Sequence, residues 1–174
     1  MKLTLIAAIS LSTLASGLAL PDLTPRATVI RPEFRVLVRE EPGPMIPLPP
    51  DIVEVSRGNG GTVRAFLCFV VPACTGMCTI SFSNAISATG SRTLQLFRTF
   101  GCPAGGTLPP TDAHLGTFLV PASGTGPAVV LEDYGLTFPC PVTTTKYGYE
   151  VQPVGDNISV TWNITNGGFV ITCY

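Results

Sequence analysis

The stretch NISVTWNIT, residues 157 to 165, decides the fold class, because polar and apolar side chains alternate along its whole length. Successive side chains of a β-strand point to opposite faces, which places Trp162 and its aliphatic neighbours on one face. A helix would spread both sets around its circumference, and β-branched residues and tryptophan favour strands. The pattern predicts a half-buried strand whose Trp162 is anchored in a core.

The polar face of this strand carries two Asn-x-Ser/Thr acceptors for N-glycosylation, at Asn157 and Asn163. Sugars are attached to such acceptors in the secretory pathway, so both candidate sites require that the chain is exported. An export signal is therefore expected elsewhere in the sequence.

Residues 1–19 have the layout of a secretory signal peptide, with Lys2, a long apolar run and then small residues near Gly17 and Ala19. A membrane anchor is the alternative, but the run is short and diluted with serine and threonine. No second apolar stretch of spanning length follows it. We expect a secreted protein, extracellular or bound to the cell wall, with no membrane span.

Short β-rich runs divided by glycine, proline, asparagine and serine continue from residue 59 to the end of the chain. The runs are TVRAFLCFVV (62–71), MCTISFS (77–83), TLQLFRTF (93–100), LGTFLV (115–120), AVVLE (128–132), KYGYEVQ (146–152), NISVTWNI (157–164) and GFVITCY (168–174). Eight runs without a helical stripe predict an all-β fold for residues 59–174, a single antiparallel β-sandwich of about eight strands. The NGG at 166–168 predicts a tight hairpin between the last two strands.

Residues 20–58 differ in composition, with eight prolines between residues 20 and 50. Such a segment cannot bury enough apolar surface to fold alone, so it is interpreted as a Pro-rich linker or pro-region. The run VIRPEFRVLVRE (29–40) alternates well enough to form a short strand on the domain edge, and this alternative stays open.

Charge argues against nucleic acid as a partner. Only 21 of the 174 residues are charged, the formal net charge is −1, and the basic residues do not cluster. A nucleic-acid-binding surface requires a basic patch that can neutralise phosphates. The expected partner is instead an extracellular polymer or protein.

The cysteines indicate disulfides, because an even number follows an export signal. The six candidates are Cys68, Cys74, Cys78, Cys102, Cys140 and Cys173. Zinc is the alternative, since CTGMC (74–78) has a ligand-like spacing, but no second close pair exists and only one histidine is present. We expect no metal. Six cysteines allow 15 pairings; Cys78 and Cys173 share their strand faces with large apolar residues, so these two could meet in the core.

Catalytic residues are not apparent in the sequence. His114, the single histidine, lies two residues after Asp112, but no serine or cysteine nucleophile occurs in a recognisable motif. A glycosidase needs two carboxylates across a cleft, and the adjacent Glu132 and Asp133 would point to opposite faces of a strand or lie in a turn. The carboxylates of the expected domain are Asp112, Glu132, Asp133, Glu150 and Asp156. We expect no enzyme activity and no cofactor.

Aromatic residues raise the alternative of sugar binding, which uses exposed rings. Strand parity places Trp162, Tyr147 and Tyr149 with apolar residues in the core. Tyr134 is the aromatic residue expected to be exposed.

Several runs occur in the order seen in one known family: FLCFVVPACTGMCTISFS, LQLFRTF, LGTFLVPASG, FPCPV followed by YGYEV, and ISVTWNITNGGFVITCY. Over about residues 60–174 the chain resembles the C-terminal domain of the fungal But family, named for binding to ubiquitin-like proteins. The resemblance implies a small secreted or wall-associated β-sandwich of filamentous fungi without an established catalytic centre. Cys68, Cys74 and Cys102 are additional to the family pattern.

Three functions follow for testing. The first is a secreted, non-enzymatic module that binds a wall polymer or a protein. The second is binding of a ubiquitin-like protein through an exposed sheet edge, as the family name suggests. The third is a glycan-active enzyme that uses Glu132 or Asp133 with Asp112.

Overall fold

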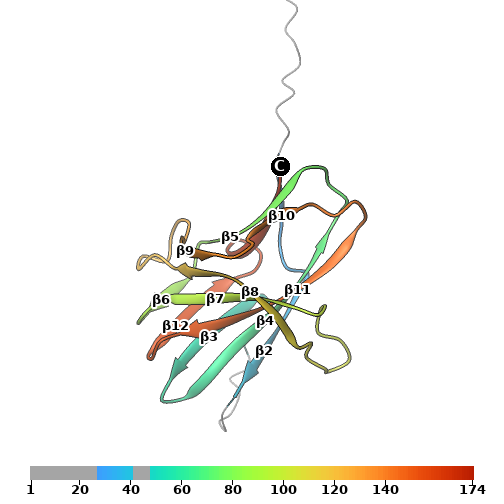
Figure 1. Ribbon diagram of the computed structural model, residues 1–174. Helices are drawn as coiled ribbons and strands as arrows, with labels where there is room; N and C mark the ends of the chain where they lie inside the picture. Colours follow the sequence, from blue (N-terminus) through green and yellow to red (C-terminus); the bar gives the residue numbers. More distant parts are fainter. Residues whose placement is uncertain (1–26, 41–47) are drawn as a thin grey trace, which may run out of the picture.

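The computed structural model describes residues 27–40 and 48–174, so the expected signal peptide at 1–19 lies outside the described residues. Every regular element in the described ranges is a β-strand, and all pairings between strands are antiparallel (Figure 1). The all-β expectation is therefore confirmed. The described part of the chain has no helix long and apolar enough to cross a membrane.

The described residues form thirteen strands, where about eight were expected. They are β1 (Thr28–Ile30), β2 (Phe34–Arg39), β3 (Ile52–Gly58), β4 (Gly61–Val71), β5 (Met77–Ser83), β6 (Ser87–Thr89), β7 (Thr93–Thr99), β8 (Thr111–Leu119), β9 (Val129–Asp133), β10 (Thr137–Pro139), β11 (Thr145–Val154), β12 (Ile158–Asn163) and β13 (Gly168–Cys173). The additional strands are mostly short, and three of them come from the Pro-rich segment.

The strands form two sheets that enclose one core. The smaller sheet has the order β1-β13-β5-β10, and the larger has the order β6-β12-β3-β4-β11-β7-β8-β9. Strand β2 also joins the larger sheet: Val63 of β4 pairs with Ser56 of β3 and with Arg39 of β2, so β3 and β2 lie on opposite edges of β4. Figure 1 shows the smaller sheet, with β5 and β10, lying across the curled larger sheet.

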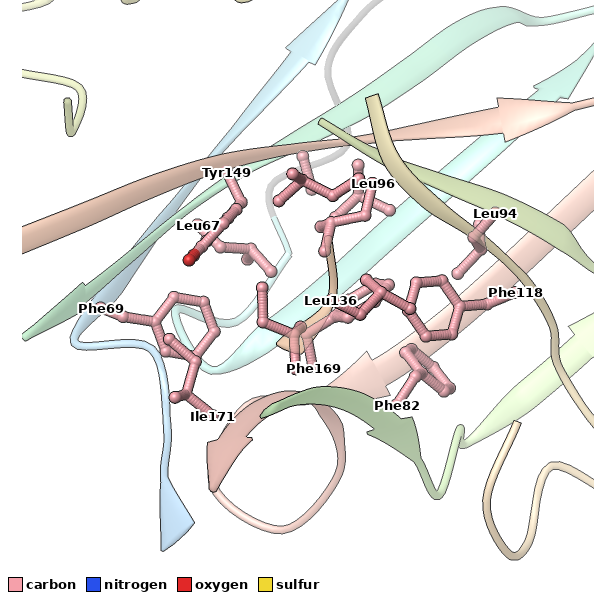
Figure 2. Packing of buried hydrophobic residues seen from close by; sticks show 14 of the residues in the cluster. Leu67, Phe69, Phe82, Leu94, Leu96, Phe118, Leu136, Tyr149, Phe169 and Ile171 are labelled. Carbon is pink, nitrogen blue, oxygen red and sulfur yellow. The ribbon is translucent and has the colours of Figure 1, made fainter. Parts of the chain in front are cut away.

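Large aromatic residues from both sheets fill the space between them. Phe82 of β5 and Phe169 of β13 belong to the smaller sheet, and each meets the fully buried Trp162 of β12 edge to face, with centroids 5.4 and 6.1 Å apart. Phe169 also packs on Phe118 of β8 at 5.1 Å. Figure 2 shows such side chains converging from the two sheets. The expectation that Trp162 anchors the core is confirmed.

The NGG turn at 166–168 does not form the expected hairpin. Strand β12 pairs with β3 and β6, whereas β13 pairs with β5 and β1, so the turn carries the chain from one sheet to the other. Gly168 has φ of 79°, and a Cβ atom there would lie 1.9 Å from Cδ1 of Trp162. The glycine is therefore needed for the close approach to the indole, and turn residues alone do not reveal which strand pairs with which.

The segment 20–58, for which a linker was expected, contributes β1, β2 and β3. Val53 and Val55 of β3 are fully buried, and β2 pairs with β4 from Phe34 opposite Cys68 to Arg39 opposite Val63. The structure therefore favours the alternative of a strand within residues 29–40. Among the described residues of this segment, Pro32 lies between β1 and β2, and Pro49 and Pro50 precede β3, so these prolines do not interrupt the strands.

Candidate binding site on strands β8 and β9

Exposed apolar side chains gather on β9, which ends the order of the larger sheet. All five residues of the strand are exposed, including Val129, Val130 and Leu131. Tyr134, just beyond the strand, is 62% exposed. Both faces of β9 are therefore accessible to solvent, whereas a strand that covers a core has one buried face.

A register shift in the neighbouring strands brings His114 beside this surface. Leu96 pairs with Gly116, but the next residue, Phe97, pairs with His114, so Leu115 is an extra residue in β8. Such a bulge redirects the side chains that follow it. His114 consequently stacks on Phe97, with ring centroids 4.9 Å apart. The Tyr134 ring also contacts His114 in a tilted arrangement, with centroids 5.2 Å apart.

Hydrogen bonds connect the aromatic stack to Glu132. Thr117 lies directly opposite Glu132 in the β8–β9 ladder, and its hydroxyl donates to Oε2 of that carboxylate. The Tyr134 hydroxyl donates to Oε1 at 3.3 Å, and Oγ1 of Thr117 lies 3.3 Å from Nε2 of His114. We call His114, Thr117, Glu132 and Tyr134 the β8–β9 cluster.

The protonation of His114 argues against a nucleophilic role for Thr117. Nε2 of His114 lies 3.0 Å from the carbonyl oxygen of Gly116, which can only accept a hydrogen bond, so Nε2 carries a hydrogen. It therefore cannot take a proton from the nearby Thr117 hydroxyl. In a catalytic triad the carboxylate orients the histidine, whereas here Glu132 accepts from the hydroxyl.

The other carboxylates considered for glycan hydrolysis have separate structural partners. Asp112 accepts a hydrogen bond from Nε of Arg98 at 2.6 Å. Asp133 accepts from the backbone amides of Leu136 and Gly135, at 2.9 and 3.0 Å, and these bonds hold its pKa below the usual value. Asp133 therefore closes the turn after β9, in agreement with the turn position expected from the sequence.

The remaining aromatic candidates lie where strand parity placed them. Tyr149 is buried and meets Phe69 edge to face at 5.6 Å, and burial raises the pKa of its hydroxyl above the usual range. Tyr147 stacks on Tyr149 with centroids 6.5 Å apart and packs against Phe138. These rings stabilise the interior, which leaves Tyr134 as the exposed member of the set.

The two glycosylation acceptors differ in their surroundings. Asn157 is exposed in the turn between β11 and β12, with φ of 55°. Asn163 is half-buried, its amide nitrogen donates to Asp51, and its oxygen accepts from the backbone amide of Thr165 at 2.8 Å. In the folded protein Asn157 is therefore the acceptor with free access for a glycan.

Four of the six cysteines form two disulfides, and the sulfur of Cys173 lies close to those of Cys74 and Cys78. Cys68 is bonded to Cys102, and Cys78 to Cys140. Cys78 and Cys173 do meet in the core, with sulfurs 3.0 Å apart, while the disulfide of Cys78 is formed with Cys140. Cys74 and Cys173 are unbonded. Strand parity predicted that Cys78 and Cys173 share a location in the core. The disulfide partner of Cys78 depends instead on the position of Cys140 at the end of β10.

The β8–β9 cluster itself was not foreseen in the sequence. The sequence suggests no link between His114 and Glu132, and the glycan-hydrolysis alternative combined Glu132 or Asp133 with Asp112. His114 lies within β8. The bulge that aligns His114 with Phe97 has no local sequence signal, because it arises from the register in which β8 pairs with β7.

Comparison with known proteins finds no matching family model, no matching curated protein and no matching solved structure. The candidate site therefore rests on the geometry of the chain itself.

Proposed function

We propose that the chain is a secreted, non-enzymatic β-sandwich that binds a polysaccharide of the cell wall through the β8–β9 cluster. The observation that carries this proposal is the Tyr134 ring, 62% exposed, packed against His114 and hydrogen-bonded to Glu132. The alternative to a polysaccharide is a protein ligand that binds the same surface.

The chemistry of the cluster suits a sugar. An aromatic ring offers a flat apolar surface, and a sugar ring has one face dominated by C–H groups, which packs on it. Glu132 is exposed at the edge of this platform and can accept hydrogen bonds from sugar hydroxyls. The stack of Tyr134 on His114 and of His114 on Phe97 holds the platform in place before the ligand arrives, so less side-chain entropy is lost on binding.

The extracellular setting has its own support. Disulfides persist in oxidising compartments, and the chain has two of them in its described part. Asn157 is exposed, as an N-glycan acceptor in a folded protein must be. The resemblance to the But C-terminal domain supports the same setting, and membership of that family remains part of the proposal.

Replacing Tyr134 with alanine should weaken binding to the wall polymer about tenfold, which corresponds to about 1.4 kcal/mol. The reason is loss of the ring on which the sugar packs, together with the hydrogen bond that orients Glu132. Binding is measured by depletion of the protein from solution by insoluble β-glucan, chitin and mannan particles. The matched control is Tyr174→Ala, because Tyr174 is also 62% exposed but lies at the end of the smaller sheet.

Equal weakening by Tyr134→Ala and Tyr174→Ala would contradict a site on β8 and β9. Failure of the unmodified protein to bind any of the three polymers would contradict the polysaccharide proposal. Release of soluble sugar from the particles, lost in Glu132→Gln, would show instead that the surface hydrolyses its ligand.

The second candidate is binding of a ubiquitin-like protein, favoured by the exposed apolar residues of β9. Val129, Val130 and Leu131 offer an apolar strand on the larger sheet, and protein ligands can dock on such strands. Direct titration of the protein with ubiquitin tests this alternative. A Val130→Asp variant that loses such binding but still adsorbs to wall polymer would separate the two functions.

A further inference from the structure

Four cysteine sulfurs gather at one end of the smaller sheet. Cys74 lies in the loop before β5, and Cys78 lies near the start of that strand. Cys140 directly follows β10, and Cys173 is the last residue of β13. All four sulfurs lie within 4.8 Å of one another. They come from three separate parts of the chain, so the fold itself brings them together.

Backbone contacts hold the three segments in this arrangement. The amide of Cys74 donates to the carbonyl of Pro141, and the amide of Cys140 donates to the carbonyl of Gly76, both at 3.0 Å. The amide of Tyr174 donates to the carbonyl of Met77 at 3.2 Å. A Cβ atom at Gly76, which has φ of 91°, would lie 2.7 Å from the carbonyl oxygen of Tyr174. The loop is therefore shaped to fit closely around the end of β13.

Distances between the sulfurs distinguish a disulfide from a metal site. Cys74 and Cys173 have their sulfurs 2.7 Å apart. Sulfurs that share a tetrahedral zinc ion with bonds of about 2.3 Å are separated by about 3.8 Å. Heavy atoms without a bond prefer separations of about 3.5–4 Å. The Cys74–Cys173 separation is shorter than either, and approaches the bonded distance of about 2.05 Å.

We propose that Cys74 and Cys173 form a third disulfide, beside the Cys78–Cys140 bond. The oxidant is an external disulfide such as oxidised glutathione. The Cys74 thiolate attacks one glutathione sulfur and releases a glutathione thiolate; the Cys173 thiolate then attacks the sulfur of Cys74 and releases the second. The protons of the two cysteines end on the two glutathione molecules, so atoms and electrons balance.

The order of these steps follows from access. Cys74 and Cys173 both line an open cavity of about 550 Å³, but Cys74 is half-buried whereas Cys173 is only 5% exposed, so the oxidant reaches Cys74 more easily. Cys173 is buried, and burial, followed by its contact with Cys74, raises the pKa of its thiol to about 11. Cys173 therefore reacts second, with the sulfur already beside it. This inference is independent of the proposed polysaccharide binding.

The geometry has a second consequence, because the sulfur of Cys173 is also 3.0 Å from that of Cys78. Without Cys74, the Cys173 thiolate can attack Cys78, form a Cys78–Cys173 bond and release Cys140 as a free thiol. Cys74 thus keeps Cys173 from exchanging with the buried disulfide. Loss of Cys173 has no such effect, since the attacking sulfur is then absent.

The test is disulfide mapping of the purified full-length protein after refolding in oxidised and reduced glutathione, so it does not depend on where the cell places the chain. Cyanogen bromide cleaves after Met77 and separates Cys74 from Cys78, and trypsin cleaves at Lys146 between Cys140 and Cys173. We expect a Cys74–Cys173 peptide and no thiol that reacts with an alkylating agent in denaturant.

Variants make the result specific. In Cys74→Ser we expect a mixture of Cys78–Cys140 and Cys78–Cys173 bonds, with alkylated Cys140 in the second form. In Cys173→Ser only the Cys78–Cys140 bond should remain in the cluster. The control is Cys102→Ser, which removes the distant Cys68–Cys102 bond and should leave Cys74–Cys173 intact.

Two outcomes would overturn the proposal. One is alkylation of both Cys74 and Cys173 in the fully refolded protein. The other is one equivalent of bound zinc together with four alkylatable cysteines in the cluster, which would assign the site to a metal.

Discussion

Replacing Trp162 with alanine is expected to lower the free energy of unfolding by about 3–5 kcal/mol, the cost typical of removing a large buried aromatic side chain. Trp162 is fully buried and contacts Phe82 and Phe169, which belong to the other sheet. The loss therefore opens a cavity between the two sheets. Gly168 lies so close to the indole that its backbone forms one wall of that cavity. The turn before it is held by hydrogen bonds to Asn163, which oppose its collapse into the cavity.

The measurement is urea denaturation followed by circular dichroism, because Trp162 is the only tryptophan and its fluorescence disappears with it. The control is Trp162→Phe, which keeps an aromatic ring between the sheets. It also removes an indole N–H that has no hydrogen-bond partner among the described residues, so its cost should be clearly smaller than that of alanine. A Trp162→Ala variant within about 1 kcal/mol of the unmodified protein would contradict the packing described here.

Replacing Arg64 with methionine is expected to cost about 3–5 kcal/mol, because it leaves a buried carboxylate without its charged partner. Glu150 of β11 is fully buried, and Arg64 of β4 donates to its Oε1. Thr111 and Gln152 also donate to this carboxylate, so Glu150 lies in a network that spans β4, β8 and β11. Methionine keeps the apolar stem of arginine but removes the charge.

Arg64 also pairs with Glu40 at 2.8 Å, but the Glu40 side chain is 43% exposed, so loss of that pair should cost only about 0–1 kcal/mol. Two comparisons test the effect of burial. Arg98→Met removes a similar ion pair, with Asp112, but the Arg98 side chain is 53% exposed, so the expected cost is about 0–1 kcal/mol. The double variant Arg64→Met with Glu150→Leu should recover much of the stability lost in Arg64→Met, since no charge then remains buried. Equal costs for Arg64→Met and Arg98→Met in urea denaturation would contradict the role assigned to Glu150.

Local alternation predicted much of the fold, since it depends only on neighbours in sequence. The period of two placed Trp162 and Tyr149 in the core, and both are buried. Pairing between strands depends on residues far apart in the chain, which explains the incorrect hairpin at 166–168. Strands β1 and β2 illustrate the same limit, because they form by pairing with distant strands: β1 pairs with β13, and β2 pairs with β4.

The candidate site was less accessible to prediction from sequence. Tyr134 was expected to be exposed because strand parity assigned the other aromatic candidates to the core, and it is exposed. Its neighbours could not be foreseen, because His114 reaches it through a bulge and Thr117 reaches Glu132 through the β8–β9 ladder. The cysteines were predictable only in part. Strand parity predicted that Cys78 and Cys173 could meet in the core, but the bonding partner of each sulfur depends on how three segments of the chain come together.

The most direct test of the central proposal, an exported and disulfide-stapled module, is the intact mass of the protein recovered from culture medium and from cells of a filamentous fungus. The account predicts a protein in the medium that lacks about 19 residues and loses mass on removal of a glycan at Asn157. It also predicts a gain of about 6 Da on reduction, about 2 Da for each of three disulfides. A gain of about 4 Da would keep the export proposal and remove only the Cys74–Cys173 bond. A full-length, unglycosylated and fully reduced protein found only in cells would contradict the account.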